Sequence, residues 1–81
     1  MTIIEAVSKR LGSLMSERGW SIYKLSRKTG LTPNGIQVIL QKTHSDVKLK
    51  TLILLANAFD MNVSEFLNCD YFEYEKLNID F

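Results

Sequence analysis

Helix start and stop signals recur along this chain and leave little of it for any other kind of structure. Thr2 and Glu5 have the spacing of a capping box, in which each side chain accepts a hydrogen bond from the other residue's backbone N–H. Gly30 stands where a helix can end, and Thr32 followed by Pro33 is a favourable start for the next one. Apolar residues recur every three or four positions between such signals, as they do on the buried face of a helix. The sequence therefore predicts an all-α domain.

Five helices are expected, followed by a tail of different character. Their predicted bounds, in chain order, are Thr2 to Gly19, Ser21 to Gly30, Pro33 to about Gln41, Leu49 to about Phe59, and a short helix after Asn62. We expect residues 1–69 to form one domain and residues 70–81 to form an acidic aromatic tail. In this tail Leu77, Ile79 and Phe81 alternate with polar residues, a pattern that favours an extended segment or a strand.

Length and composition exclude several classes of protein. A chain of 81 residues forms one domain with a shallow core. Its longest apolar run, Leu52 to Ala56, is far shorter than the roughly 20 residues of a membrane-spanning helix, and we expect neither a membrane partner nor a signal peptide. The single cysteine, Cys69, cannot form an internal disulfide, which favours the cytoplasm. The single histidine, His44, has no acid or nucleophile beside it at a recognisable spacing, so we expect no enzyme, metal site or cofactor.

The formal net charge of +1 conceals two halves of opposite sign. Residues 1–50 carry nine basic and three acidic side chains, which gives +6, whereas residues 51–81 carry one basic and six acidic side chains, which gives −5. Between Arg18 and Ser45 the chain has no acidic residue. This division indicates a basic face for a polyanion and an acidic end that points away from it, although a merely solvated surface has the same composition.

One segment, from Ser21 to Leu40, has the layout of a helix-turn-helix and reads SIYKLSRKTGLTPNGIQVIL. Leu25 and the small Ser26 point inward from its first helix, Gly30 makes the turn, and a capped second helix follows. Together with its flanks, including LKTLILLANAFDMNVSEFL after it, this unit resembles the lambda-repressor-like family of DNA-binding domains, the Cro and phage repressor or Xre type. The resemblance covers residues 4 to about 68 and implies a five-helix domain in which the second and third helices form the motif.

The resemblance also implies a sequence-specific transcriptional regulator, which we expect to be a bacterial or phage-encoded repressor with double-stranded DNA as its partner. In this family the third helix lies in the major groove with its N-terminal residues at the base edges. The base-reading positions carried over to this chain are Thr32, Pro33, Asn34, Gln37, Val38 and Gln41. Asn34 and Gln37 are able to hold adenine N6 and N7, whereas the apolar pair Pro33 and Val38 can contact only thymine methyl groups. A plain solvated helix face is the alternative for each.

A second set of residues is predicted to contact DNA phosphates, which positions a protein without reading sequence. Members of this set lie at a helix start or carry polar or basic groups on the same face; they are Ser21, Lys24, Arg27, Lys28, Lys42, Thr43 and His44. Solubility alone is the alternative explanation for the lysines. Ile22 departs from the family pattern, which often has a phosphate-binding glutamine at this position. Tyr23 either stacks on a sugar or covers the edge of the motif.

The second half of the chain is predicted to form a homodimer, because one short recognition helix reads few base pairs. The fourth helix is expected to leave Leu54 facing solvent, where a second subunit would cover it, and to bury Leu49, Leu52, Leu55, Ala56 and Phe59. The tail adds large apolar residues to the dimer surface, unless it folds back over its own domain. The competing function is an antitoxin-like or regulatory protein-interaction module with the same fold. No small-molecule ligand is evident from the residues.

Overall fold

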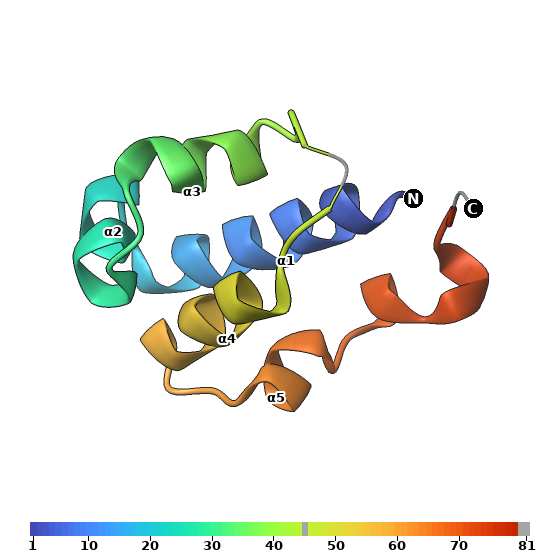
Figure 1. The fold of residues 1–81 in the computed structure, drawn as a ribbon. Helices are drawn as coiled ribbons and strands as arrows, with labels where there is room; N and C mark the ends of the chain where they lie inside the picture. Colours follow the sequence, from blue (N-terminus) through green and yellow to red (C-terminus); the bar gives the residue numbers. More distant parts are fainter. Residues whose placement is uncertain (45, 80–81) are drawn as a thin grey trace.

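The computed structural model describes residues 1–44 and 46–79 of the chain. Its elements in chain order are α1 (Ile3–Arg18), α2 (Ile22–Thr29), α3 (Pro33–Leu40), α4 (Leu49–Ala58), α5 (Val63–Leu67) and two short 3-10 helices, η1 (Asp70–Phe72) and η2 (Tyr74–Lys76). No strand occurs within the described ranges, so the predicted all-α fold with five α-helices is confirmed (Figure 1). None of the helices in this part of the chain has the length and apolar character that crossing a bilayer requires.

Local hydrogen bonds start the helices where the sequence predicts. The Thr2 hydroxyl accepts from the Glu5 N–H at 3.2 Å and the Glu5 carboxylate accepts from the Thr2 N–H at 2.9 Å, which confirms the capping box. The Thr32 hydroxyl caps α3 by accepting from the Gly35 N–H at 3.0 Å. Hydrogen bonds from the backbone N–H and the hydroxyl of Thr2 lower the pKa of Glu5. This cap therefore stabilises α1 at neutral pH, and its contribution is lost as the pH falls through the lowered pKa.

The core lies between α1 and the other helices. In Figure 1, α3 lies on one side of α1, and α4 and α5 lie on the other. Each of the five α-helices contributes fully buried side chains, which include Val7, Leu11 and Leu14 of α1, Leu25 of α2, Ile36 of α3, Leu55 of α4 and Phe66 of α5. Phe59, directly after α4, stacks on Trp20 with the two ring centroids 4.9 Å apart. These contacts hold α2 and α3 in a constant position relative to the rest of the domain.

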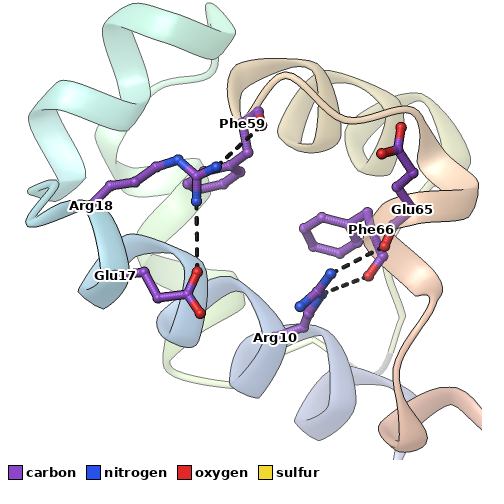
Figure 2. A network of polar contacts seen from close by, with 6 residues as sticks. All are labelled: Arg10, Glu17, Arg18, Phe59, Glu65 and Phe66. Carbon is purple, nitrogen blue, oxygen red and sulfur yellow. Dashed lines mark hydrogen bonds and ion pairs between the residues drawn. The ribbon is translucent and has the colours of Figure 1, made fainter.

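Arg10 ties α1 to the C-terminal end of α5 (Figure 2). Its Nε donates to the Phe66 carbonyl oxygen at 2.7 Å, and its Nη2 donates to the Glu65 carbonyl oxygen at 3.1 Å. The guanidinium carbon also lies 5.9 Å from the centroid of the Phe66 ring. The last carbonyl groups of a helix have no partner within it, and a cation there satisfies them and interacts favourably with the helix dipole. Arg10 therefore holds α5 in place.

Arg18 makes a similar contact after α4. Its Nη2 donates to the Phe59 carbonyl oxygen at 3.4 Å, and its guanidinium carbon lies 5.0 Å from the centroid of the Phe59 ring (Figure 2). On the same aromatic stack, the Lys28 ammonium lies 5.1 Å from the centroid of the Trp20 ring. Cations this close to an aromatic face are attracted by the ring quadrupole. Basic side chains of α1 and α2 thus surround the Trp20–Phe59 pair and join both helices to the end of α4.

The prediction for α4 is wrong at the N-terminal end of the helix. The sequence places Leu49 in the core, but Leu49 is 62% exposed, and Ile53 one turn later is 48% exposed. Leu54, predicted to face solvent, is half-buried. The reason is that the buried residues of α4 lie in its second half, so its first turn packs against little of the core. The large apolar side chains that α4 exposes are therefore Leu49 and Ile53, which lie on one face because they are four residues apart.

The tail forms two short 3-10 helices and then becomes extended. Residues 70–76 contain η1 and η2, and Phe72 packs against the core. Leu77, where the extended segment is predicted to begin, has extended backbone angles of φ −99° and ψ 134°, and residues 77–79 form neither a helix nor a strand. The Met1 ammonium donates to the Lys76 carbonyl oxygen at 2.7 Å, and the Asn78 N–H donates to the Met1 carbonyl oxygen at 2.8 Å. Burial of apolar surface against the chain's own core stabilises this arrangement without a second subunit. The tail therefore folds back over its own domain beside the start of α1, while Phe81 lies outside the described residues.

Candidate nucleic-acid interface

Hydroxyl groups fix the turn between α2 and α3. The Ser26 hydroxyl donates to the Leu31 carbonyl oxygen at 2.6 Å. The Thr29 hydroxyl donates to the Leu25 carbonyl oxygen at 2.9 Å and accepts from the Leu31 N–H at 3.1 Å. Gly30 lies between them with a φ of 79°, in the left-handed region that favours glycine. Thr29 is buried and is not among the predicted site residues, although a hydroxyl directly before a turn glycine is a recognisable signal.

α3 buries Ile36 and Ile39 and leaves its opposite face open. All six predicted base-reading residues reach the surface. Those that are exposed are Thr32, Asn34 and Gln41, and those that are half-buried are Pro33, Gln37 and Val38. The Thr32 hydroxyl also caps α3, and Gln41 follows its last turn. The structure therefore places these side chains where a ligand can reach them, and their base-reading roles stay a prediction.

A shallow groove runs between the first turns of α2 and α3. The residues that line it are Ile22, Tyr23, Pro33, Asn34 and Gln37. Tyr23 is 70% exposed, whereas Ile22 packs partly against the core. The structure thus brings three predicted base readers, Pro33, Asn34 and Gln37, next to two α2 residues that have no base-reading role in the prediction. No spacing rule connects the two groups, because they come from different helices.

The predicted phosphate-binding residues do not form one cluster. Ser21 and Lys24 lie at the start of α2, where the Ser21 hydroxyl accepts from the Lys24 N–H at 3.1 Å. Lys42, Thr43 and His44 follow the other end of α3 and line a separate hollow beside the first turn of α1 and the tail. All five side chains are exposed. The two groups therefore flank α3, one near each of its ends.

Contacts within the protein divide its basic residues into two sets. Arg10 and Arg18 bond carbonyl groups, Lys28 lies over Trp20, and the Lys9 ammonium lies 4.8 Å from the centroid of the Tyr71 ring. Lys76 pairs with the Asp70 and Glu73 carboxylates at 3.8 and 3.7 Å. The remaining basic residues are exposed and make no such contact with the described part of the chain; they are Lys24, Arg27, Lys42, Lys48 and Lys50. The phosphate role of Lys28 stays a prediction, and its ammonium is turned toward Trp20. Lys48 and Lys50, at the start of α4, are additional candidates that the sequence prediction did not include.

Lys42 occupies a strained position after α3. Its φ is 59°, and a left-handed conformation costs a residue with a Cβ about 1–2 kcal/mol. The Lys42 N–H donates to the Ile39 carbonyl oxygen at 3.1 Å, and the Thr43 N–H donates to the Val38 carbonyl oxygen at 3.1 Å, which closes the end of α3. Glycine is the usual residue at such a helix end. A lysine therefore occupies a position where its backbone conformation is unfavourable.

A two-helix unit with a fixed turn and an open second helix defines a helix-turn-helix domain. Comparison with known protein families agrees, because the model of the Cro/C1-type HTH DNA-binding domain matches residues 10–71, which include all of α2, α3, α4 and α5. The chain belongs to this family and is a DNA-binding regulator. No curated protein and no solved structure matches it.

Replacing Lys42 with glycine should separate its effect on folding from its effect on DNA. We expect Lys42→Gly to stabilise the domain by about 0.5–1 kcal/mol, because glycine adopts the left-handed conformation without a Cβ clash. The same variant should bind all DNA sequences more weakly, with the slope of log K against log salt reduced by about 0.9 for one lost phosphate contact. Urea unfolding and binding titrations at several salt concentrations measure the two effects.

Asp60→Gly provides a matched control for this experiment. Asp60, the second residue after the end of α4, has a φ of 58°, so the same relief of strain is expected there. Asp60→Gly should raise the free energy of unfolding but leave the slope of log K against log salt for DNA binding unchanged. An equal change in salt slope for both variants would contradict a phosphate contact at Lys42.

Proposed function

We propose that the protein is a repressor that binds specific double-stranded DNA sequences by placing α3 in the major groove. The observation that carries this proposal is the open face of α3, where the amides of Asn34 and Gln37 lie beside the groove that α3 forms with α2. Asparagine and glutamine side chains can bond adenine N6 and N7 together, which distinguishes an A·T pair in the major groove. The fixed turn supports the proposal because it holds α3 at a constant angle to α2.

The charge around α3 supports the same orientation. The first turns of α2 and α3 contain no acidic residue. The exposed basic side chains include Lys24 at one end of the motif and Lys42 beyond the other. Phosphate contacts on both sides of a recognition helix would set its register in the groove, and base contacts would then select the sequence.

Selection of bound sequences from a random duplex library tests this function and yields the binding site. On that site, Asn34→Ala and Gln37→Ala should each weaken binding by about 1–3 kcal/mol and leave non-specific binding nearly unchanged. Lys24→Ala should instead weaken binding to every sequence and reduce the salt slope. Asn68→Ala is a matched control, since it removes an exposed amide at the end of α5 and should change neither.

Two outcomes would contradict the proposal. If the amide variants and the lysine variant affect specific and non-specific DNA alike, α3 is not the recognition helix. If the protein shows no salt-dependent retention on duplex DNA, the protein-interaction module with the same fold becomes the better explanation.

We also propose that the protein binds DNA as a homodimer through the outer face of α4. α3 is only eight residues long, and a helix of this length reads a few base pairs, so two copies about one DNA turn apart are needed for a longer site. Leu49 and Ile53 provide an exposed apolar surface one turn apart on α4. We expect the tail to contribute less to the dimer interface than its composition suggests, because Phe72 packs against the core of its own domain.

A further inference from the structure

We propose that the groove between α2 and α3 receives the C5-methyl group of a thymine, so that Ile22 and Tyr23 of α2 determine sequence specificity together with α3. This inference rests on the proposed function, in which α3 lies in the major groove. It assigns a base-reading role to a helix that otherwise contacts only the sugar-phosphate backbone in the prediction.

The walls of the groove are apolar where α2 and α3 approach each other. Ile22 and Tyr23 come from the first turn of α2, and Pro33 comes from the first turn of α3. Ile22 packs against the core and is held in place by it, and the proline ring is rigid. Tyr23 is 70% exposed, so most of its surface is open to a ligand beside the open face of α3. The groove is therefore a preformed apolar surface at the edge of the proposed interface.

Only one group in the major groove of DNA is complementary to such a surface. The base edges there present hydrogen-bond donors and acceptors, and the thymine C5-methyl is the one apolar group. The amides of Asn34 and Gln37 line the same groove. An amide that holds adenine lies next to the thymine paired with it, because both bases present their edges on the same side of the A·T pair. One A·T pair, or two adjacent ones, would satisfy both the amides and the apolar walls.

The identity of residue 22 agrees with this role. The resemblance described above implies a phosphate-binding glutamine at this position, and isoleucine has no group that could bond a phosphate. In the structure Ile22 forms part of the groove wall beside Pro33. A branched aliphatic side chain gives up hydrogen bonding to a phosphate but gains contact with a methyl group.

Replacing thymine with deoxyuridine tests the proposal, because it removes the methyl group and leaves every hydrogen-bonding group of the base unchanged. In the selected binding site each thymine is replaced in turn and the dissociation constant is measured. We expect one thymine in each half-site at which deoxyuridine weakens binding of the unaltered protein about fourfold, the equivalent of about 0.8 kcal/mol for one buried methyl-sized group. At that thymine, Ile22→Ala and Tyr23→Ala should each reduce or abolish the difference between the two bases.

Matched controls make the result specific. Tyr74→Ala removes a tyrosine that is 68% exposed on the tail, and it should leave the deoxyuridine effect at fourfold. Ile22 contributes to the packing of α2, so thermal unfolding of Ile22→Ala is measured alongside; if this variant does not fold, the exposed Tyr23→Ala decides the question.

The possible failures are distinguishable. Absence of specific DNA binding would overturn the proposed function itself. Specific binding without any deoxyuridine effect, or a selected site without thymine, would overturn only the methyl pocket. The deoxyuridine effect could also persist in full in Tyr23→Ala and in folded Ile22→Ala. In that case α3 alone contacts the methyl group, and the proposed role of α2 in the methyl pocket is overturned.

Discussion

Phe66→Ala should remove a large part of the domain's stability. Phe66 is 0% exposed and comes from α5, a helix of five residues that is too short to form without tertiary contacts. Replacing a buried phenylalanine with alanine typically costs about 3–5 kcal/mol, and the total stability of a domain of this length is about 4–12 kcal/mol. The loss includes the contact between the ring and the Arg10 guanidinium, 5.9 Å from its centroid.

Urea unfolding followed by the fluorescence of Trp20 measures this effect, since Trp20 is the single tryptophan and stacks on Phe59. Cys69, half-buried shortly after α5, provides a local measurement, because its thiol should react faster in Phe66→Ala under native conditions. Tyr74→Ala removes an exposed aromatic ring and should change stability by less than about 0.5 kcal/mol. Equal urea midpoints for Phe66→Ala and the unaltered protein would show that α5 is not part of the cooperative core.

The double variant Leu49→Ser, Ile53→Ser should bind the selected DNA site about 100-fold more weakly or worse while folding normally. Leu49 is 62% and Ile53 is 48% exposed, so replacing them should remove little buried surface from the isolated domain. If they form the proposed dimer interface, each recognition helix of the variant must bind its half-site separately. The second half-site then no longer benefits from the high effective concentration that a dimer provides, a contribution of about 10²–10⁴.

Mass measurements in solution at tens of micromolar accompany the binding titrations. The unaltered protein should be a dimer and the double variant a monomer. Tyr74→Ser is the matched control, because it also removes an exposed apolar side chain but from the tail. A double variant that remains dimeric would place the interface elsewhere, and an unaltered protein that is monomeric and still binds a two-fold symmetric site would exclude a preformed dimer.

The sequence by itself determined the helices and their starts. Thr2, Thr32 and Asn62 each bond a backbone N–H three residues later, and such contacts depend only on residues that are close along the chain. The inward positions of Leu25 and Ile36 followed in the same way from helical periodicity. The resemblance to a known family rested on these local features, and the match over residues 10–71 confirmed it.

Only the tertiary structure decided which surface remains available for a partner. Arg10 bonds the Phe66 carbonyl oxygen across 56 positions of sequence, and Met1 bonds the Lys76 carbonyl oxygen across 75. From composition alone such a cation would be assigned to the surface charge. Composition does not show which carbonyl group or aromatic ring a long side chain will contact. For the same reason the sequence could not show that Leu49 is exposed outside the core, or that Ile22 lies beside Pro33. These relations depend on how separate helices pack against one another, and no pattern within a single helix records them.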